Sequence, residues 1–224
     1  MSHAVVVTGA AGALGRAVVA EFQRAGQPVV ALDRLGPALD ALDAPHRIPV
    51  ELTDRGDVGR AFAEIDGRGL TVGTLVAVAG GYSHGGLADL DPDTLHGLFD
   101  TNLGTLVWAA QAAAPRIAAA GGGSIVAVGA RTGTSGPAQL VHGASKAAVH
   151  RTVELLADEL RGQRIRVNAV LPSVVDTPAN REWMDADAVD RAVVPAAIAR
   201  VIAFLAGPDA APVSGALVPV YGDS

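Results

Sequence analysis

The sequence predicts an α/β fold in which helices cover both faces of a parallel sheet. Strand-like apolar runs alternate with helix-like patterns along the whole chain, as parallel sheets with helical crossovers require. Half of the 224 residues are hydrophobic and only 18% are charged, so the chain can bury a substantial core. No repeat, low-complexity tract or linker interrupts it. We therefore expect residues 1–224 to form a single domain.

The first strand is expected at residues 4–7, a β-branched run of the kind that is buried inside parallel sheets. A turn with Gly9, Gly12 and Gly15 follows, and then an apolar helical pattern that ends at Gly26. Such a turn brings free backbone N–H groups and the positive end of a helix dipole to one place, which suits a pyrophosphate. Three glycines alone also occur in strand-to-helix turns that bind nothing.

The second strand, residues 28–33, ends on Asp33. An acid at this place after the glycine turn accepts hydrogen bonds from the adenosine ribose and repels a 2′-phosphate. NAD is therefore the expected cofactor. The neighbouring Arg34 keeps NADP possible, because a guanidinium can hold a phosphate.

Three residues set expectations for the elements that follow. Pro49 cannot donate to a sheet ladder, so the third strand should lie at an edge. Thr53 or Asp54 is a natural helix N-cap, and Pro115 should kink or end the helix that contains it. The remaining strands are expected at 47–52, 74–78, 124–129, 165–170 and 217–220. The remaining helices are expected at 36–42, 53–65, 93–119, 140–160 and 195–206. Residues 171–190, with prolines and scattered acids, are expected to form an irregular loop over the site.

Composition excludes several functions. The net charge of −6 without a basic run argues against nucleic acid or an anionic membrane as partner. The absence of cysteine excludes disulfides and thiolate chemistry, and the histidine spacing suggests no metal site. The first strand begins almost at once, which leaves no room for a signal peptide, and no apolar run approaches the roughly 20 residues that span a bilayer. We expect a cytoplasmic protein that acts on a small molecule.

Six short motifs carry a resemblance to the short-chain dehydrogenase/reductase family. They are Thr8-Gly9-x-x-Gly12-x-x-Gly15, Leu52-Thr53-Asp54, Ala79-Gly80, Thr101-Asn102-Leu103, Ala144-Ser145-Lys146-Ala147, and Asn168-Ala169-Val170 with Pro172-x-x-Val175-x-Thr177. Each is weak alone, but their order and spacing together are specific. Gly12-Ala13-Leu14-Gly15 and residues 176–181 also resemble the dihydropteridine reductase branch.

The resemblance implies a doubly wound Rossmann fold with sheet order 3-2-1-4-5-6-7 and a ligand crevice beyond strands one and four. In the family's pattern Asp54 holds the adenine, Ala79-Gly80 lines the ribose, and residues 172–177 border the nicotinamide. The resemblance also implies a homodimer or homotetramer. The implied cofactor-binding residues are Gly9, Gly12, Ala13, Leu14, Gly15, Asp33, Arg34, Leu52, Thr53, Asp54, Ala79, Gly80, Lys146, Pro172, Val175 and Thr177.

Two departures from the family's pattern concern the catalytic centre. His142 stands where members carry a tyrosine four residues before the lysine, and Gly129 and Ala130 fill the region of the usual serine. The resemblance implies that Lys146 binds the nicotinamide ribose and that Asn102 relays protons to it. Residues 142 and 146 are one helical turn apart on the same face, and the lysine charge should keep the imidazole neutral at pH 7.

We interpret His142, Lys146 and Asn102 as the catalytic residues of an NAD(P)H-dependent reduction of a carbonyl, quinonoid or imine group. His142 would act as hydrogen-bond donor or acid; alternatively it packs at the helix start and the redox step is lost. Two other functions remain open: a non-redox enzyme (cyclase, isomerase or dehydratase) and a cofactor-binding protein without turnover. Tyr82, His84 and Arg131 could face the substrate, Arg131 as an anion-binding group.

Overall fold

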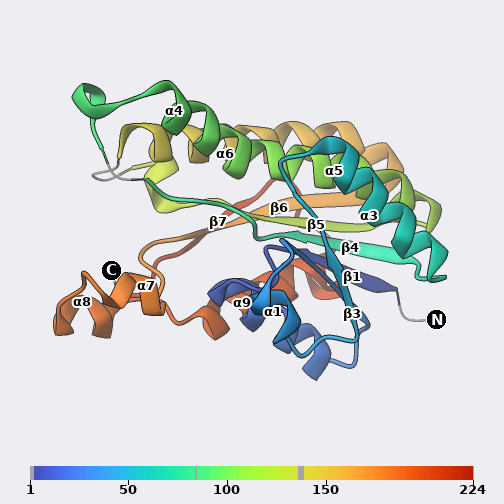
Figure 1. The fold of residues 1–224 in the computed structure, drawn as a ribbon. Helices are drawn as coiled ribbons and strands as arrows, with labels where there is room; N and C mark the ends of the chain where they lie inside the picture. The colour runs from blue at the N-terminus through green and yellow to red at the C-terminus, as the bar shows by residue number, and fades with distance from the viewer. Residues whose placement is uncertain (1–2, 84, 136–138, 224) are drawn as a thin grey trace.

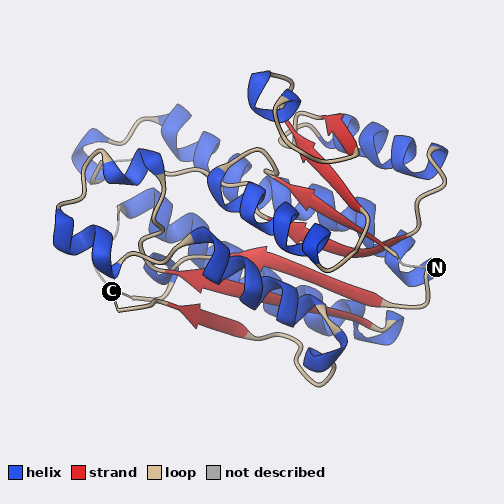
Figure 2. Ribbon diagram, turned by 90° about the horizontal axis from the view of Figure 1, so that it is seen from below, coloured by secondary structure: helices blue, strands red, loops and turns tan. Residues whose placement is uncertain are grey.

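Seven parallel strands form one sheet in the order β3-β2-β1-β4-β5-β6-β7 (Figure 1), in a computed structural model that describes residues 3–83, 85–135 and 139–223. All strand arrows point in the same direction (Figure 2), so the carboxyl ends of the strands lie at the same side of the sheet. The predicted fold class and strand order are confirmed, with β3 at an edge as Pro49 indicates. The strands are β1 Ala4–Thr8, β2 Val29–Asp33, β3 His46–Pro49, β4 Val72–Ala77, β5 Gly123–Val128, β6 Ile165–Pro172 and β7 Leu217–Val220.

Helices cover both faces of the sheet (Figure 1). On the upper face lie α3 Arg55–Gly67, α4 Pro92–Phe99, α5 Thr105–Ala119 and α6 Leu140–Leu160. On the lower face lie α1 Ala13–Arg24 and α9 Pro195–Ala206, and the short α2 Pro37–Asp40 links β2 to β3. Among the described residues, none of the helices is both long and apolar enough to cross a membrane.

The sheet separates two hydrophobic clusters, because successive side chains of a strand point to opposite faces. In β1, Ala4 and Val6 pack with α3, α5 and α6, whereas Val5 and Val7 pack with α1 and α9. All four side chains are buried. The apolar run that predicts β1 thus supplies both layers and holds the glycine turn after it in place.

Two segments differ from the prediction. The helix expected over 93–119 is interrupted by a π-helical turn at Asp100–Gly104, and α5 runs through Pro115 to Ala119. The proline therefore does not end the helix. Residues 171–190 are not an irregular loop, since they contain α7 Pro178–Arg181 and α8 Ala186–Arg191. Both short helices begin with capped first turns, in which Thr177 and Asp185 accept from backbone N–H groups.

Candidate active site

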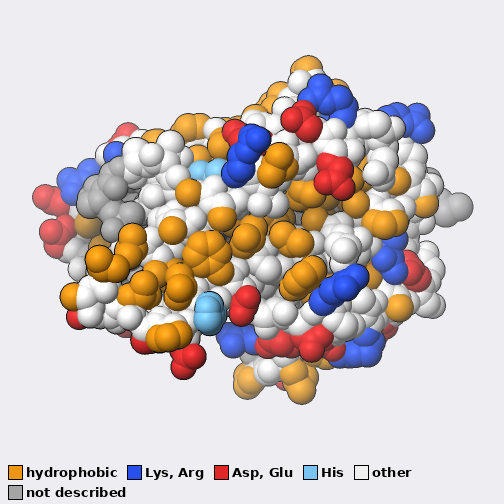
Figure 3. Space-filling view, turned by 90° about the horizontal axis from the view of Figure 1, so that it is seen from above, with side chains coloured by type: hydrophobic (Ala, Val, Ile, Leu, Met, Phe, Trp, Pro, Cys, Tyr) orange, Lys and Arg blue, Asp and Glu red, His pale blue; other side chains and the backbone are white. Residues whose placement is uncertain are grey.

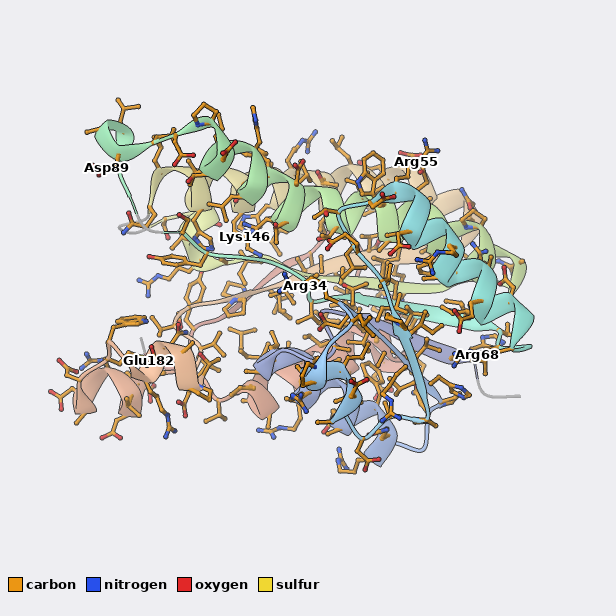
Figure 4. All side chains as sticks on the ribbon, in the orientation of Figure 1. Arg34, Arg55, Arg68, Asp89, Lys146 and Glu182 are labelled. Carbon is orange, nitrogen blue, oxygen red and sulfur yellow. The ribbon has the colours of Figure 1, made fainter. Side chains whose placement is uncertain are left out.

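A cavity of about 920 Å³ lies where the carboxyl ends of the strands meet. Its walls come from the turns after β1, β2 and β4 and from residues after β6, the crevice that open parallel sheets use for ligands. In Figure 4, Arg34 and Lys146 lie in the middle of the molecule, whereas Asp89 and Glu182 mark the upper and lower parts of its left side. Predicted residues that line it are Gly9, Gly12, Ala13, Leu14, Gly15, Asp33, Arg34, Leu52, Thr53, Ala79, Gly80, Val175 and Thr177.

The turn after β1 has no room for side chains at two of its glycines. Gly9 has φ +63°, and a Cβ there would lie 2.7 Å from the backbone nitrogen of Ala79. A Cβ on Gly15 would collide with the carbonyl oxygen of Gly9. The glycines therefore let α1 begin directly against β1. The N–H groups of its first turn have no carbonyl partner within the helix, and they face the cavity.

Asp33 joins the end of β2 to this turn. One carboxylate oxygen accepts from the Ala11 N–H at 2.8 Å, and the other accepts from the Arg34 N–H at 2.7 Å. Each oxygen keeps a further lone pair for a ribose hydroxyl. With the glycine turn, the helix N-terminus and a volume within the range of cofactor sites, these residues fit a dinucleotide.

Three predicted cofactor residues, Asp54, Lys146 and Pro172, do not line the cavity. Asp54 is the N-cap of α3, where its Oδ1 accepts from the N–H groups of Gly56 (2.7 Å) and Asp57 (2.9 Å). Only Oδ1 takes part in this cap, so the expected contact of Asp54 with the adenine stays a prediction. Pro172 pairs with Val220 within the sheet and also lies outside the lining. Glu51, which precedes Leu52 and Thr53, lines the cavity instead and was not among the predicted residues.

His142 is buried near the start of α6, with 9% of its surface exposed. Its Nδ1 lies 3.2 Å from the hydroxyl of Thr132, in the turn after β5. The ring of Tyr82 contacts it edge-on, with centroids 4.9 Å apart. His142 does not itself line the cavity, and its ring is in contact with Tyr82 and Thr132. His84, which was expected near the substrate together with Tyr82 and Arg131, lies outside the described residues.

Asn102 and Lys146 converge on the cavity wall at Gly80. A Cβ on Gly80 would lie 2.9 Å from Asn102 Oδ1 and 3.2 Å from Lys146 Nζ. Lys146 Nζ donates to the Val128 carbonyl at 2.9 Å. Asn102 accepts from the Gly81 N–H (2.8 Å) and donates to the Gly81 carbonyl (3.2 Å), so its amide fixes the segment after β4. Asn102 and Lys146 therefore lie next to each other, and the hydrogen bonds of Asn102 hold the backbone of Gly81 in place.

Burial changes the protonation of both helix side chains. Burial and then the charge of Lys146 lower the pKa of His142 to about 4. Burial lowers the pKa of Lys146 to about 8. At pH 7 the imidazole is therefore neutral, whereas the lysine still carries its proton.

Two further groups lie near the site: Arg131, which was expected to face the substrate, and His150, which belongs to none of the motifs. Arg131 stacks on the ring of Tyr221, 5.1 Å from its centroid, beside Thr132. His150 is buried two turns beyond His142 on α6 and contacts the same turn after β5. The sequence indicates its position by spacing: His142, Lys146 and His150 follow one another at intervals of four residues, which places them on one face of a helix. Within the described part of the chain, no three His, Asp or Glu side chains gather as a metal site needs.

Comparison with known proteins gives consistent relatives. A family model described as short chain dehydrogenase matches residues 3–188. Galactitol 2-dehydrogenase (L-tagatose-forming) of Cereibacter sphaeroides is 32% identical, with 96% of this chain and 92% of that protein covered. Dihydropteridine reductase of Dictyostelium discoideum is 30% identical, with 97% and 94% covered. A solved oxidoreductase of the short chain dehydrogenase/reductase family from Burkholderia thailandensis superposes with a TM-score of 0.89 at 29% identity, covering 99% of this chain and 92% of that one.

Proposed function

This chain belongs to the short-chain dehydrogenase/reductase family and is an NAD(P)-dependent oxidoreductase, and from that premise we propose that it reduces a carbonyl, quinonoid or imine group of a small organic substrate, with His142 in the place of the family's tyrosine. The observation that carries the proposal is the buried His142 ring, held by Thr132 one helical turn before Lys146.

NADH is the proposed reductant. When bound, its dihydronicotinamide would supply the hydride. Asp33 supports NADH over NADPH, because its fixed carboxylate offers acceptors to ribose hydroxyls and repels a 2′-phosphate. Arg34 lines the same wall and keeps some affinity for NADPH.

His142 acts as a neutral donor in this proposal. With a pKa of about 4 it is almost never an imidazolium at pH 7, but a neutral imidazole retains one N–H that can polarise a carbonyl. If the Thr132 hydroxyl donates to Nδ1, that N–H is on Nε2. Lys146, with a pKa of about 8, remains protonated and is the proton reservoir for the reduced oxygen or nitrogen.

The test is NADH oxidation with a panel of aldehydes, ketones, quinones and quinonoid dihydropterins. Replacing His142 with phenylalanine should lower turnover by at least about 100-fold, since removal of one hydrogen-bond donor to a developing oxyanion typically costs that much. NADH affinity, measured by fluorescence quenching, should stay nearly unchanged. His142→Tyr, which restores the family's phenol, should keep turnover measurable. The exposed His96 on α4 gives the matched control, and His96→Phe should leave turnover unchanged.

Equal turnover by the His142→Phe variant and the wild type would contradict the role of His142. NADH binding without oxidation by any compound would favour a cofactor-binding protein. A substrate that changes without NADH consumption would favour a non-redox enzyme of the same fold.

Assembly as a homodimer or homotetramer is part of the proposal. Apolar side chains gather over the upper helical layer (Figure 3). Leu95 on α4 and Leu140 and Leu155 on α6 are exposed there. A second copy of the chain would remove this apolar area from water.

A further inference from the structure

His150 fills a space that two glycines leave open beneath the turn after β5. Its side chain is 5% exposed. A Cβ on Gly129 would lie 2.5 Å from the ring nitrogen Nε2, and a Cβ on Gly133 would lie 2.6 Å from Cε1. Neither distance is tolerable for real atoms. The imidazole therefore occupies the volume that any side chain at position 129 would need.

The hydrogen bonds of His150 determine its tautomer. The Ala130 N–H donates to Nε2 at 3.3 Å. A backbone amide can only donate, so Nε2 carries the lone pair and the proton of the neutral ring is on Nδ1. Nδ1 lies 3.4 Å from the hydroxyl oxygen of Thr134, which accepts that proton. The His150 ring thus forms hydrogen bonds with both ends of the segment formed by residues 130–134.

One residue of the same segment also contacts His142. Thr132, in the middle of the segment, contacts His142 Nδ1 at 3.2 Å. His142 and His150 lie on one face of α6, two turns apart, with Lys146 between them. Lys146 in turn donates to the carbonyl of Val128, at the end of β5 where the turn begins. The turn is therefore fixed from three successive positions of one helix face.

We propose that His150 is a positioning residue for His142: it holds residues 130–134 so that Thr132 sets the orientation and tautomer of the His142 imidazole. The inference rests on the proposed role of His142 in the reaction. His150 needs no contact with substrate or cofactor for this role. It acts through the Ala130 N–H and the Thr134 hydroxyl.

The first test compares three variants of the full-length protein. His150→Leu fills the space but offers no acceptor to the Ala130 N–H, whereas His150→Gln can supply one through Oε1. Arg151→Gln is the control, because Arg151 is the exposed neighbour on the same helix. ¹⁵N NMR of the His142 ring reports which nitrogen carries the proton, and this readout does not depend on turnover.

The wild type, His150→Gln and Arg151→Gln should each show one His142 tautomer, and His150→Leu should show a mixture of two. In the NADH oxidation assay, with the compound that the wild type reduces fastest, His150→Leu should lose at least about tenfold in turnover, because a misplaced donor is costly. His150→Gln should recover most of that loss. Unchanged His142 nitrogen shifts in His150→Leu would overturn the inference.

A second test covers the case in which His150→Leu does not fold. Thr134→Val keeps the His150 ring and removes only the hydroxyl that accepts its Nδ1 proton. The ¹⁵N signals of the His142 ring should again show two tautomers, and a single unchanged tautomer would overturn the inference. If the wild type oxidises NADH with no compound at all, the proposed function fails, but the tautomer measurements still decide the role of His150.

Discussion

In the proposed function, single side chains select the nucleotide, and Asp33 is the plainest case. Both of its oxygens are occupied by backbone N–H groups, at 2.8 and 2.7 Å, so the carboxylate cannot turn away from the cavity wall. A fixed negative charge discriminates between a ribose hydroxyl and a phosphate more strongly than a mobile one, because no reorganisation relieves the repulsion. Arg34 lines the cavity beside it, and we propose that its positive charge favours a 2′-phosphate.

We predict that Asp33→Ala shifts the preference from NADH toward NADPH. The ratio of kcat/KM for NADPH to that for NADH should rise at least about tenfold, since a hydrogen bond to a charged group contributes about 1.5–3 kcal/mol. The measurement is steady-state kinetics with both cofactors. Asp43→Ala is the matched control, because Asp43 is exposed and does not line the cavity. An unchanged ratio in Asp33→Ala would show that Asp33 does not select the cofactor.

At the scale of elements, local signals predict regular helices well. The predicted bounds of α6 (140–160) and α9 (195–206) agree with the structure, because a proline begins α9 and apolar periodicity runs through both helices. The order of the strands followed from the family resemblance and not from local patterns. Local signals fail where a distant contact decides. The π-helical turn at Asp100–Gly104 contains Asn102, which pairs with Gly81 across a long loop.

The same limit applies to the site. The turn after β1 was predictable, because its glycines and Asp33 sit at fixed distances along the chain. Asp54 is predicted to hold the adenine, but an acid before a helix is also suited to a cap, and the cap formed by its Oδ1 appears only in the structure. The contacts of His142 with Thr132 and Tyr82 join three separate elements, and nothing in the local sequence specifies them.

We predict that Asn102→Ala destabilises the protein through the segment after β4. The substitution removes the hydrogen bonds to both backbone groups of Gly81 and to Ser145 and leaves these groups without their partner. The expected loss is at least about 2 kcal/mol of unfolding free energy, or about 4–8 °C in Tm. Gln111→Ala on α5 removes only an exposed contact with Arg55 and should cost less than about 0.5 kcal/mol. Equal Tm values for the two variants would contradict the structural role of Asn102.

Among the described residues, the buried basic side chains all lie on α6, in the upper layer. His142, Lys146 and His150 each lose hydration on folding, and the positive charge of Lys146 adds to the effect on both histidines. Glu154 opposes it only at His150. Folding therefore favours the neutral forms of the two imidazoles, and the stability of the chain is linked to pH.

We predict that the free energy of unfolding rises with pH between about 4.5 and 6.5. Burial lowers the pKa of His142 to about 4 and lowers that of His150, whereas both return toward 6.5 in the unfolded chain. In this window the unfolded chain binds more protons, so acid favours unfolding, by at most about 1.4 kcal/mol per pH unit for each imidazole. The carboxyl of Asp176, whose pKa is lowered by Arg181, has the same sign but acts at lower pH. The lowered pKa of Lys146 acts only above about pH 8.

Urea unfolding at a series of pH values measures this dependence directly. The double variant His142→Gln/His150→Gln, which removes both titrating rings, should flatten the curve between about pH 4.5 and 6.5. His96→Gln, at an exposed position on α4, should leave the slope as in the wild type. A wild-type stability that is constant or falls with rising pH in this window would mean that the α6 histidines are hydrated or charged in the folded protein. In that case His142 would be an imidazolium at mildly acid pH, and it would serve the reaction as an acid and not as a neutral donor.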